Sequence, residues 1–141
     1  MAAVGAAAVF GVVVGLFVVP LLVDEPHEFA GTVLSNPQPA PEFILTADTG
    51  DRVSLESYRG QVVLMYFGYT FCPDICPASL AELAKAADQL GERANEVQVV
   101  MVSVDPARDT PEALNEYMDY FDPGFVGLTG SDSLIAAVAD A

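Results

Sequence analysis

The chain contains two cysteines, Cys72 and Cys76, and both lie in the short segment 71–77, which reads FCPDICP. This segment directly follows the apolar run 62–67, so a buried strand is predicted to lead into a helix at the cysteines. The amides and the dipole of a helix N-terminus stabilise negative charge and therefore favour the thiolate. Because the thiolate binds soft metal ions and attacks disulfides, this placement indicates that the two cysteines bind a metal ion or react with disulfides.

The C-x3-C spacing is one residue longer than the C-x2-C of thioredoxin-type motifs, and it also allows structural explanations. One helical turn leaves the two Cα atoms about 6 Å apart, within range of a disulfide. A disulfide that closes so short a loop removes little unfolded-state entropy and would stabilise the fold weakly. Two inert buried thiols are disfavoured by Pro73, Pro77 and the loop position, which predict exposed sulfurs. We therefore favour a chemical role.

Two kinds of chemistry remain open from the residues alone. Two thiolates are soft ligands that suit Cu(I), whereas structural zinc normally takes four ligands, including further cysteines or histidines. The sequence supplies no second pair of this kind. The alternative is thiol–disulfide exchange, in which one thiolate attacks and the other resolves the mixed disulfide. The spacing does not separate metal binding from exchange.

The elements predicted around the cysteines alternate between strand and helix. A hairpin comes first, with strands at 42–46 and 52–55 joined by a turn at 48–51. The segment 61–67 is apolar on both faces, which is typical of a central strand in a covered sheet. Apolar periodicity and caps predict the remaining elements: helix 79–90, strand 96–104, helix 111–121, strand 124–128 and helix 131–139.

This order, a hairpin followed by β-α-β-α-β-α, predicts an α/β fold with a largely parallel sheet. Sites in open sheets of this kind form at the carboxyl ends of strands. Cys72 and Cys76 follow one strand, and the segment 103–105 ends the neighbouring strand. We therefore expect the two loops to face the same crevice.

The net charge of the 141 residues is −15, yet the segment 2–23 contains no charged residue. This segment is long enough to cross a hydrocarbon core of about 30 Å. It lacks the positive n-region and the cleavage site of a signal peptide. We predict one transmembrane anchor at 1–23, a juxtamembrane linker at 24–41 and one folded domain at 42–141. The missing flanking Lys and Arg residues leave the orientation unspecified by charge.

The acidity of the domain excludes nucleic acid as a partner, because phosphates require a basic surface. A solvated, repulsive surface that keeps the domain in solution explains the charge equally simply. A basic partner protein or a cation is compatible with it.

Two longer stretches contain the cysteines and the neighbouring strand end. The first, 66–77, reads YFGYTFCPDICP, and the second, 102–112, reads VSVDPARDTPE. Both resemble the Sco/SenC family of membrane-anchored, thioredoxin-like copper chaperones, which help to assemble the CuA centre of cytochrome c oxidase. The resemblance extends from about residue 42 to the C-terminus and implies a thioredoxin-like fold.

The resemblance also implies that Cys72 and Cys76 are copper ligands, for Cu(I) and also for Cu(II). The implied partners are the oxidase subunit that carries CuA, other copper chaperones or thiol reductants, and the membrane through the N-terminal helix.

The Asp-containing loop of the family falls on 105–111, where we favour structural roles. Thr110 is predicted to cap a helix, Asp105 to end a strand, and Arg108 to pair with Asp109 at the surface.

The family's third copper ligand is a downstream histidine, and this sequence has none at a matching position. Its single histidine, His27, lies in the predicted linker, where a solvated side chain is the simplest interpretation. The sequence stops at Ala141 within a helical pattern, so we expect a thioredoxin-like domain that is incomplete at its C-terminus. Two thiolates, alone or with an exogenous ligand, would then hold Cu(I), and Cu(II) would bind more weakly.

The leading prediction is a membrane-anchored Cu(I) chaperone rather than an enzyme. Its domain is expected on the outer side of the membrane, in the periplasm or another extracytoplasmic space, or in the mitochondrial intermembrane space. The alternative is a membrane-tethered thiol–disulfide oxidoreductase in which Cys72 or Cys76 attacks an acceptor disulfide. A third interpretation is a redox-sensing module whose disulfide state alters partner binding.

Overall fold

The computed structural model describes residues 31–140. The chain divides into two compact units, 1–38 and 39–141, and the described residues of the first unit form no helix or strand. The predicted anchor 1–23, the start of the linker and His27 lie outside the described residues. Between residues 31 and 140, no helix is long and apolar enough to cross a membrane. The elements that position the cysteines all belong to the second unit.

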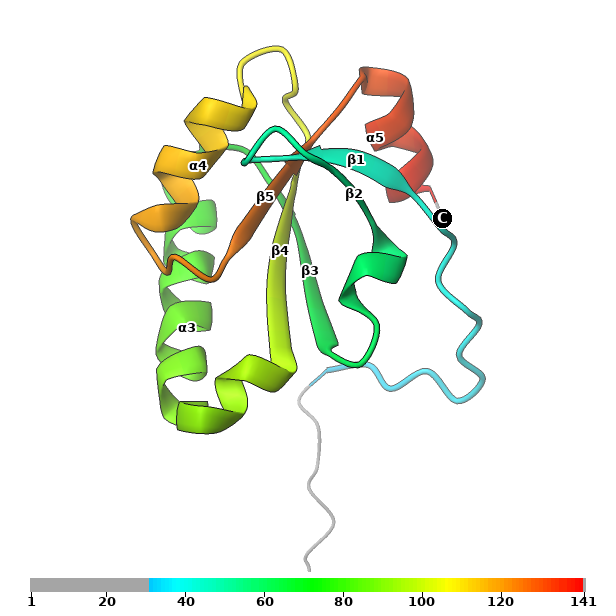
Figure 1. Cartoon of the computed structure of the whole chain (residues 1–141), viewed down its shortest axis with the longest axis vertical. Coiled ribbons are helices and arrows are strands. Elements are labelled where there is room, and N and C mark those ends of the chain that lie inside the picture. The colour runs from blue at the N-terminus through cyan, green and yellow to red at the C-terminus, as the bar shows by residue number, and fades with distance from the viewer. Residues whose placement is uncertain (1–30, 141) are drawn as a thin grey trace, which may run out of the picture. The chain divides into compact units, whose positions relative to one another are not determined.

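A five-stranded mixed sheet forms the centre of the second unit (Figure 1). Three parallel strands, β3, β4 and β5, follow the hairpin strands β1 and β2, and β1 runs antiparallel to both β2 and β5. The order across the sheet is β2-β1-β5-β4-β3. The strands are β1 (Ile44–Ala47), β2 (Arg52–Ser54), β3 (Val62–Gly68), β4 (Val97–Ser103) and β5 (Val126–Thr129). The predicted hairpin and the parallel β-α-β arrangement are confirmed.

Three α-helices of the described chain cover the two faces of this sheet: α3 (Ile75–Leu90), α4 (Pro111–Asp119) and α5 (Asp132–Ala139). Helices α3 and α4 lie on one face, and α5 lies on the other (Figure 1). Two short 3-10 helices, Leu55–Tyr58 and Gly91–Glu96, were not predicted.

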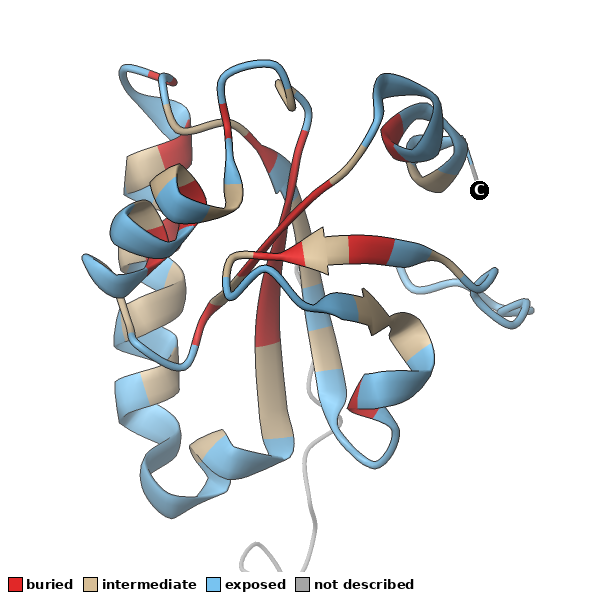
Figure 2. Ribbon diagram, turned by 45° about the horizontal axis from the view of Figure 1, so that its top comes forward, coloured by how far each residue is buried: buried red, intermediate tan, exposed pale blue. Residues whose placement is uncertain are grey.

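Strand β4 lies at the centre of the core, because most of its residues are buried and they belong to clusters on both faces of the sheet (Figure 2). The buried cluster under α3 and α4 consists of Leu80, Val99, Met101, Leu114, Met118 and Phe125. The cluster on the α5 face consists of Leu45, Ala47, Tyr58, Val100, Val102, Leu128 and Ile135. The end of β4 is therefore fixed by packing on both sides.

Helix α3 begins at Ile75, four residues before the predicted start at Ser79. The amide of Ala78 donates a hydrogen bond to the carbonyl oxygen of Asp74 at 3.2 Å and closes the first turn. Pro77 fits into this turn because the first amides of a helix need no intrahelical partner. The apolar periodicity starts only after this turn, which explains why the sequence placed the helix start too late.

The prediction that 61–67 forms a central strand was wrong. In the described part of the chain β3 pairs only with β4, and it forms one edge of the sheet. Its apolar side chains are only partly covered: Val62 is 61% exposed, Leu64 41% and Phe67 40%. Apolar residues on both faces of a strand report on the layers above and below it, and they do not report whether both of its edges are paired.

Candidate functional site

Both cysteines lie at the carboxyl end of β3, where the chain turns into α3 (Figure 1). Cys72 belongs to the connecting loop, and Cys76 is the second residue of α3. Both are free thiols. They are buried, with 9% of Cys72 and 3% of Cys76 exposed, so the prediction of exposed sulfurs was wrong.

Gly68 allows the sulfur of Cys76 to lie against the end of β3. A Cβ atom added at Gly68 would lie 2.7 Å from Cε1 of Tyr66 and 3.4 Å from Sγ of Cys76. The first distance is too short for a real contact, so a larger residue would displace the ring or the thiol. The loop also turns inward, because the amide of Cys72 donates to the carbonyl oxygen of Tyr69 at 3.2 Å. The glycine therefore leaves room for the sulfur of Cys76, and the turn fixes the backbone at Cys72.

The start of α3 stabilises negative charge on Cys72. The amide of Cys76 donates a hydrogen bond to Sγ of Cys72 at 3.4 Å. Hydrogen bonding with the side chain of Cys76, and then with the backbone amides of Asp74 and Cys76, lowers the pKa of Cys72 from 9.0 to about 7, while burial opposes the shift. Cys72 is therefore substantially ionised near neutral pH, as the sequence predicts for a thiol at a helix start.

The thiol pair acts on three tyrosines, and the pKa of each phenol is raised. Burial raises the pKa of Tyr66, and hydrogen bonding with Cys76 adds to this effect. The charge of Cys72 and hydrogen bonding with it raise the pKa of Tyr69. Burial, followed by the charges of Cys76 and Cys72, raises the pKa of Tyr117 to about 12. All three phenols stay protonated at neutral pH, so each O–H group remains a hydrogen-bond donor.

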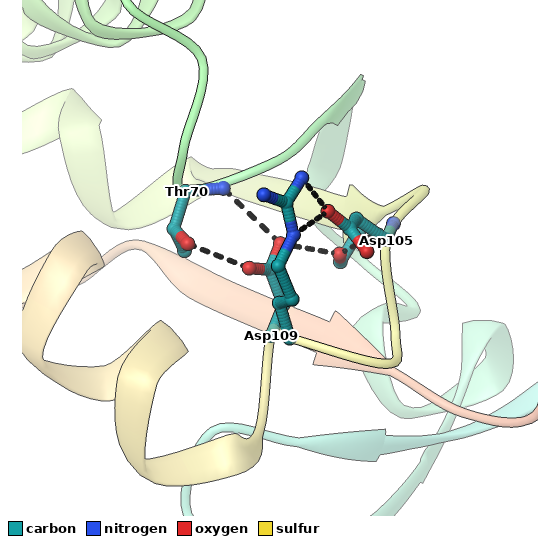
Figure 3. Close-up of polar contacts among 5 residues, drawn as sticks. Thr70, Asp105 and Asp109 are labelled. Carbon is teal, nitrogen blue, oxygen red and sulfur yellow. Dashed lines mark hydrogen bonds and ion pairs between the residues drawn. The ribbon is translucent and has the colours of Figure 1, made fainter.

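The loop after β4 contributes a fully buried carboxylate, that of Asp109 (Figure 3). It accepts hydrogen bonds from the amide of Thr70 at 3.1 Å, the hydroxyl of Thr70 at 2.6 Å and the hydroxyl of Ser103 at 2.6 Å. Thr70 lies two residues before Cys72, so this carboxylate ties the cysteine loop to the end of β4. The two loops face each other, as predicted.

The predicted pair of Arg108 with Asp109 was wrong, because the buried hydroxyls and the amide occupy the oxygens of Asp109. Arg108 pairs instead with Asp105, with Nε 2.5 Å from Oδ2 (Figure 3). Its guanidinium group also lies 4.7 Å from the centre of the Phe71 ring, directly beside Cys72. Asp105 was predicted to end a strand, but β4 ends two residues earlier, at Ser103, and Asp105 lies in the following loop, where it pairs with Arg108.

Sequence reasoning missed Asp109 and the three tyrosines as parts of this site. Asp109 lies in a stretch that was noted, but only the fold brings its carboxylate to Thr70, 39 residues earlier. Tyr66 and Tyr69 flank the strand end before the cysteines, and aromatic residues at that position were a usable signal. Tyr117 gave none, because its spacing in α4 is also that of an ordinary core position.

The atoms that could ligate a metal ion at this site fit a soft metal. Throughout residues 31–140, no three His, Cys, Asp or Glu side chains come together in a way that could hold a metal ion. The oxygens of Asp109 are already used by Thr70 and Ser103. Two sulfurs, one of them readily ionised, suit Cu(I) better than zinc or magnesium. The residues present therefore fit copper with two protein ligands.

An α/β domain with a C-x3-C thiol pair at a strand–helix junction defines a dithiol protein of the thioredoxin-like class. The SCO1/SenC family model matches residues 32–141, and the chain belongs to the SCO1/SenC family. The family prediction drawn from 66–77 and 102–112 is confirmed.

Three known proteins illustrate the relationship. Protein SenC of Rhodobacter capsulatus is 41% identical over 147 residues, which cover 99% of this chain and 66% of SenC. The crystal structure of Arabidopsis thaliana ScoI with copper bound has 43% identity and a TM-score of 0.68, covering 72% of this chain and 63% of that one. BsSco, described as a member of the Sco family of cytochrome c oxidase assembly proteins with a disulfide switch, has 32% identity and a TM-score of 0.61, covering 71% and 60%. The chain spans no more than 66% of the length of any of the three.

Proposed function

We propose that this chain is a copper chaperone in which Cys72 and Cys76 bind Cu(I) and deliver it to the CuA site of cytochrome c oxidase. The observation that carries the proposal is the paired, buried sulfur site, in which the amide of Cys76 holds Sγ of Cys72 and the pKa of Cys72 is about 7. The relatives support it, since a copper-bound ScoI is 43% identical and BsSco belongs to a family of cytochrome c oxidase assembly proteins.

A two-thiolate site is suited to transfer. Two protein ligands leave room for a thiolate or an imidazole of an acceptor to bind the ion before Cys72 and Cys76 release it. Two exposed apolar side chains flank the sulfurs, Phe71 at 64% and Ile75 at 70% exposure. Exposed apolar residues grouped at a reactive site favour docking of a partner protein. The acceptor would therefore contact 71–75 while the ion changes ligands.

The proposal includes attachment to a membrane. The uncharged segment 2–23 would serve as the anchor, and 24–41 would connect it to the folded domain. The domain would then work on the outer side of the membrane, in the periplasm, another extracytoplasmic space or the intermembrane space.

Titration of the reduced full chain with Cu(I), against a chelator of known affinity, tests the proposal. We expect stoichiometric binding by the wild type and its loss in both Cys72→Ser and Cys76→Ser. Lys85→Ala removes an exposed ion pair with Glu82 on α3 and serves as the control, with wild-type binding expected. Stoichiometric copper that survives either cysteine substitution would rule out the two-thiolate site.

A second candidate function is reduction of acceptor disulfides, which the pKa of Cys72 favours. A thiol whose pKa lies near the ambient pH is close to optimal as an attacking group. Cys72 would attack the acceptor disulfide, and Cys76 would then resolve the mixed disulfide and leave the acceptor reduced. Rapid reduction of a protein disulfide by a chain that binds no copper tightly would favour this function over the first.

A further inference from the structure

A hollow of about 340 Å³ lies between the loop after β3 and helix α4. Its lining consists of Thr70, Phe71, Ala113, Glu116, Tyr117 and Tyr120. The rim is aromatic and open, because Phe71 is 64% exposed and Tyr120 83%. Ligand pockets generally span about 300–1,000 Å³, so this hollow suits a single side chain better than a cofactor. Aromatic rings around such a hollow are typical of surfaces that anchor one side chain of a partner protein.

The walls of this hollow are held in place in the free chain. Tyr117 and Tyr120 both pack edge-to-face on Phe121, with their ring centres 5.2 Å and 5.1 Å from its own. On the side of the loop, the amide and hydroxyl of Thr70 donate hydrogen bonds to the buried carboxylate of Asp109. A partner that enters the hollow therefore meets walls that are already ordered, which lowers the entropy cost of binding.

Helix α4 adds negative charge along one side of the hollow. Its residues Glu112, Glu116 and Asp119 are exposed and share one helix face, because they lie four and three positions apart. Glu116 also lines the hollow, so it joins the acidic face to the aromatic rim. None of the three takes part in an ion pair with another residue of 31–140. Like charges at this spacing repel one another, so a cationic partner would stabilise the face.

The arginine beside the loop does not supply that cation. Arg108 lies 4.7 Å from the centre of the Phe71 ring, but its guanidinium group is paired with Asp105. The whole chain has 5 Lys and Arg residues against 20 Asp and Glu residues. A second copy of this chain is therefore a poor occupant of the hollow, whereas a basic segment of another protein is complementary to it.

We propose that this hollow and the acidic face of α4 form a docking site for a basic segment of the acceptor protein. One aromatic or large aliphatic side chain of that segment fills the hollow, and flanking lysines or arginines pair with Glu116 and Asp119. Phe71 directly precedes Cys72, so the residues next to the anchored side chain lie beside the sulfurs. The identity of the partner as an acceptor rests on the proposed function, whereas the docking chemistry rests on the hollow and its charges alone.

The chain contains no tryptophan, so a tryptophan in a probe peptide reports docking without background. The probe is Lys-Lys-Trp-Lys-Lys with blocked ends, titrated with the metal-free full chain in an uncharged detergent, with micelles alone as the blank. At 0.15 M salt, exposed charges farther away than about 8 Å are largely screened, so the net charge of the chain contributes little. We expect saturable binding, with the tryptophan emission shifted to shorter wavelength as the ring leaves water. Glu-Glu-Trp-Glu-Glu should not bind.

Two pairs of substitutions separate the acidic face from the net charge. Glu116→Gln with Asp119→Asn should weaken peptide binding by about threefold or more, because each exposed ion pair adds up to a few-fold in affinity. Asp88→Asn with Asp140→Asn removes the same charge from α3 and from the end of α5, and should leave binding at the wild-type value. Tyr120→Ala removes an exposed wall of the hollow and should weaken binding with little change in melting temperature.

Equal losses of binding in the two pairs of substitutions would mean that only the net charge attracts the peptide, and would overturn the inference. So would binding of the acidic peptide, wild-type binding by Tyr120→Ala, or tryptophan emission that stays at the wavelength of the free peptide. A wild type that binds the basic peptide but no Cu(I) would remove the proposed function and leave the docking site standing.

Discussion

The loops after β3 and β4 lie together at the carboxyl ends of these two strands, but different contacts hold them in place. The loop after β4, residues 104–110, is closed by its own backbone: the amides of Arg108 and Asp109 both donate to the carbonyl oxygen of Asp105. The loop after β3, residues 69–74, carries the reactive Cys72 and is fixed largely from outside, through Thr70 and the buried carboxylate of Asp109. One loop supplies the rigidity, and the other supplies the chemistry.

The strands below the loops differ in the same way. The four central residues of β4, 99–102, are at most 4% exposed, whereas β3 lies at the sheet edge with Val62 and Leu64 partly open. A loop anchored on the most buried strand can hold its neighbour in place while that neighbour changes ligands. Under the proposed function, this arrangement would allow the sulfurs to bind and release an ion without disturbing the core.

The largest effect is expected from Asp109→Ala, which breaks the link between the loops. The buried hydroxyl of Ser103 would lose its acceptor, at about 1–3 kcal/mol, and so would the part-buried amide and hydroxyl of Thr70, at a smaller cost. We expect the free energy of unfolding, measured by urea denaturation, to fall by about 3 kcal/mol. Asp109→Asn keeps one acceptor oxygen, so its free energy of unfolding should fall less. Wild-type stability of Asp109→Ala would contradict the link.

A smaller effect is expected from Gly68→Ala, which disturbs the packing around the sulfur of Cys76. The new Cβ would meet Tyr66 at 2.7 Å and Cys76 Sγ at 3.4 Å, and overpacking of this kind costs about 1–3 kcal/mol. Stability should fall by that amount and Cu(I) affinity should fall with it, as measured by urea denaturation and chelator competition. Gly31→Ala is the control, because no described residue lies within 4 Å of its added Cβ. Unchanged copper affinity in Gly68→Ala would show that the position of Cys76 tolerates displacement.

A change in pH should act on Cys72 in the loop after β3. The pKa of Cys72 is about 7 in the folded chain against an ordinary 9.0, so between these values the unfolded chain binds a proton that the folded chain has lost. The free energy of unfolding should therefore rise from about pH 7 to about pH 9 and lose this gain as the pH falls through about 7. The measurement is the difference between wild type and Cys72→Ser in urea midpoints across this range. A pH-independent difference would mean that the Cys72 thiolate is not stabilised by folding.

The smallest effect is expected from Arg108→Lys in the loop after β4. The pair with Asp105 is partly exposed, with 54% of the Arg108 side chain accessible, and such pairs contribute about 0–1 kcal/mol. Lysine keeps the charge but loses the planar group above Phe71. We expect a thermal shift of a few degrees at most and wild-type copper affinity. A large loss of copper binding would mean that Arg108, rather than Asp109, holds the cysteine loop.

The sequence predicted those parts of the molecule that depend on local pattern. The hairpin, the parallel strands and the helix cap at Thr110, which accepts from the amide of Ala113, follow from periodicity and residue preference. Burial of Cys72 and Cys76 could not be predicted in this way, because it depends on tertiary packing, such as that of the Cys76 sulfur against Gly68. The contact of Asp109 with Thr70 and the place of β3 at the sheet edge depend on long-range arrangement, which no local pattern records.

The outer edge of β3 also affects how copies of this chain behave together. Between residues 31 and 140, β3 has no partner strand on its outer side. Residues 62–68 contain no charge and no proline, so the amides and carbonyls along that edge can template a strand from another molecule. The net charge of −15 opposes such contacts through long-range repulsion. Dissolved salt screens that repulsion over about 10 Å at 0.1 M and about 3 Å at 1 M. Colloidal stability of this acidic protein should therefore decline as ionic strength rises, with assembly starting along a single strand.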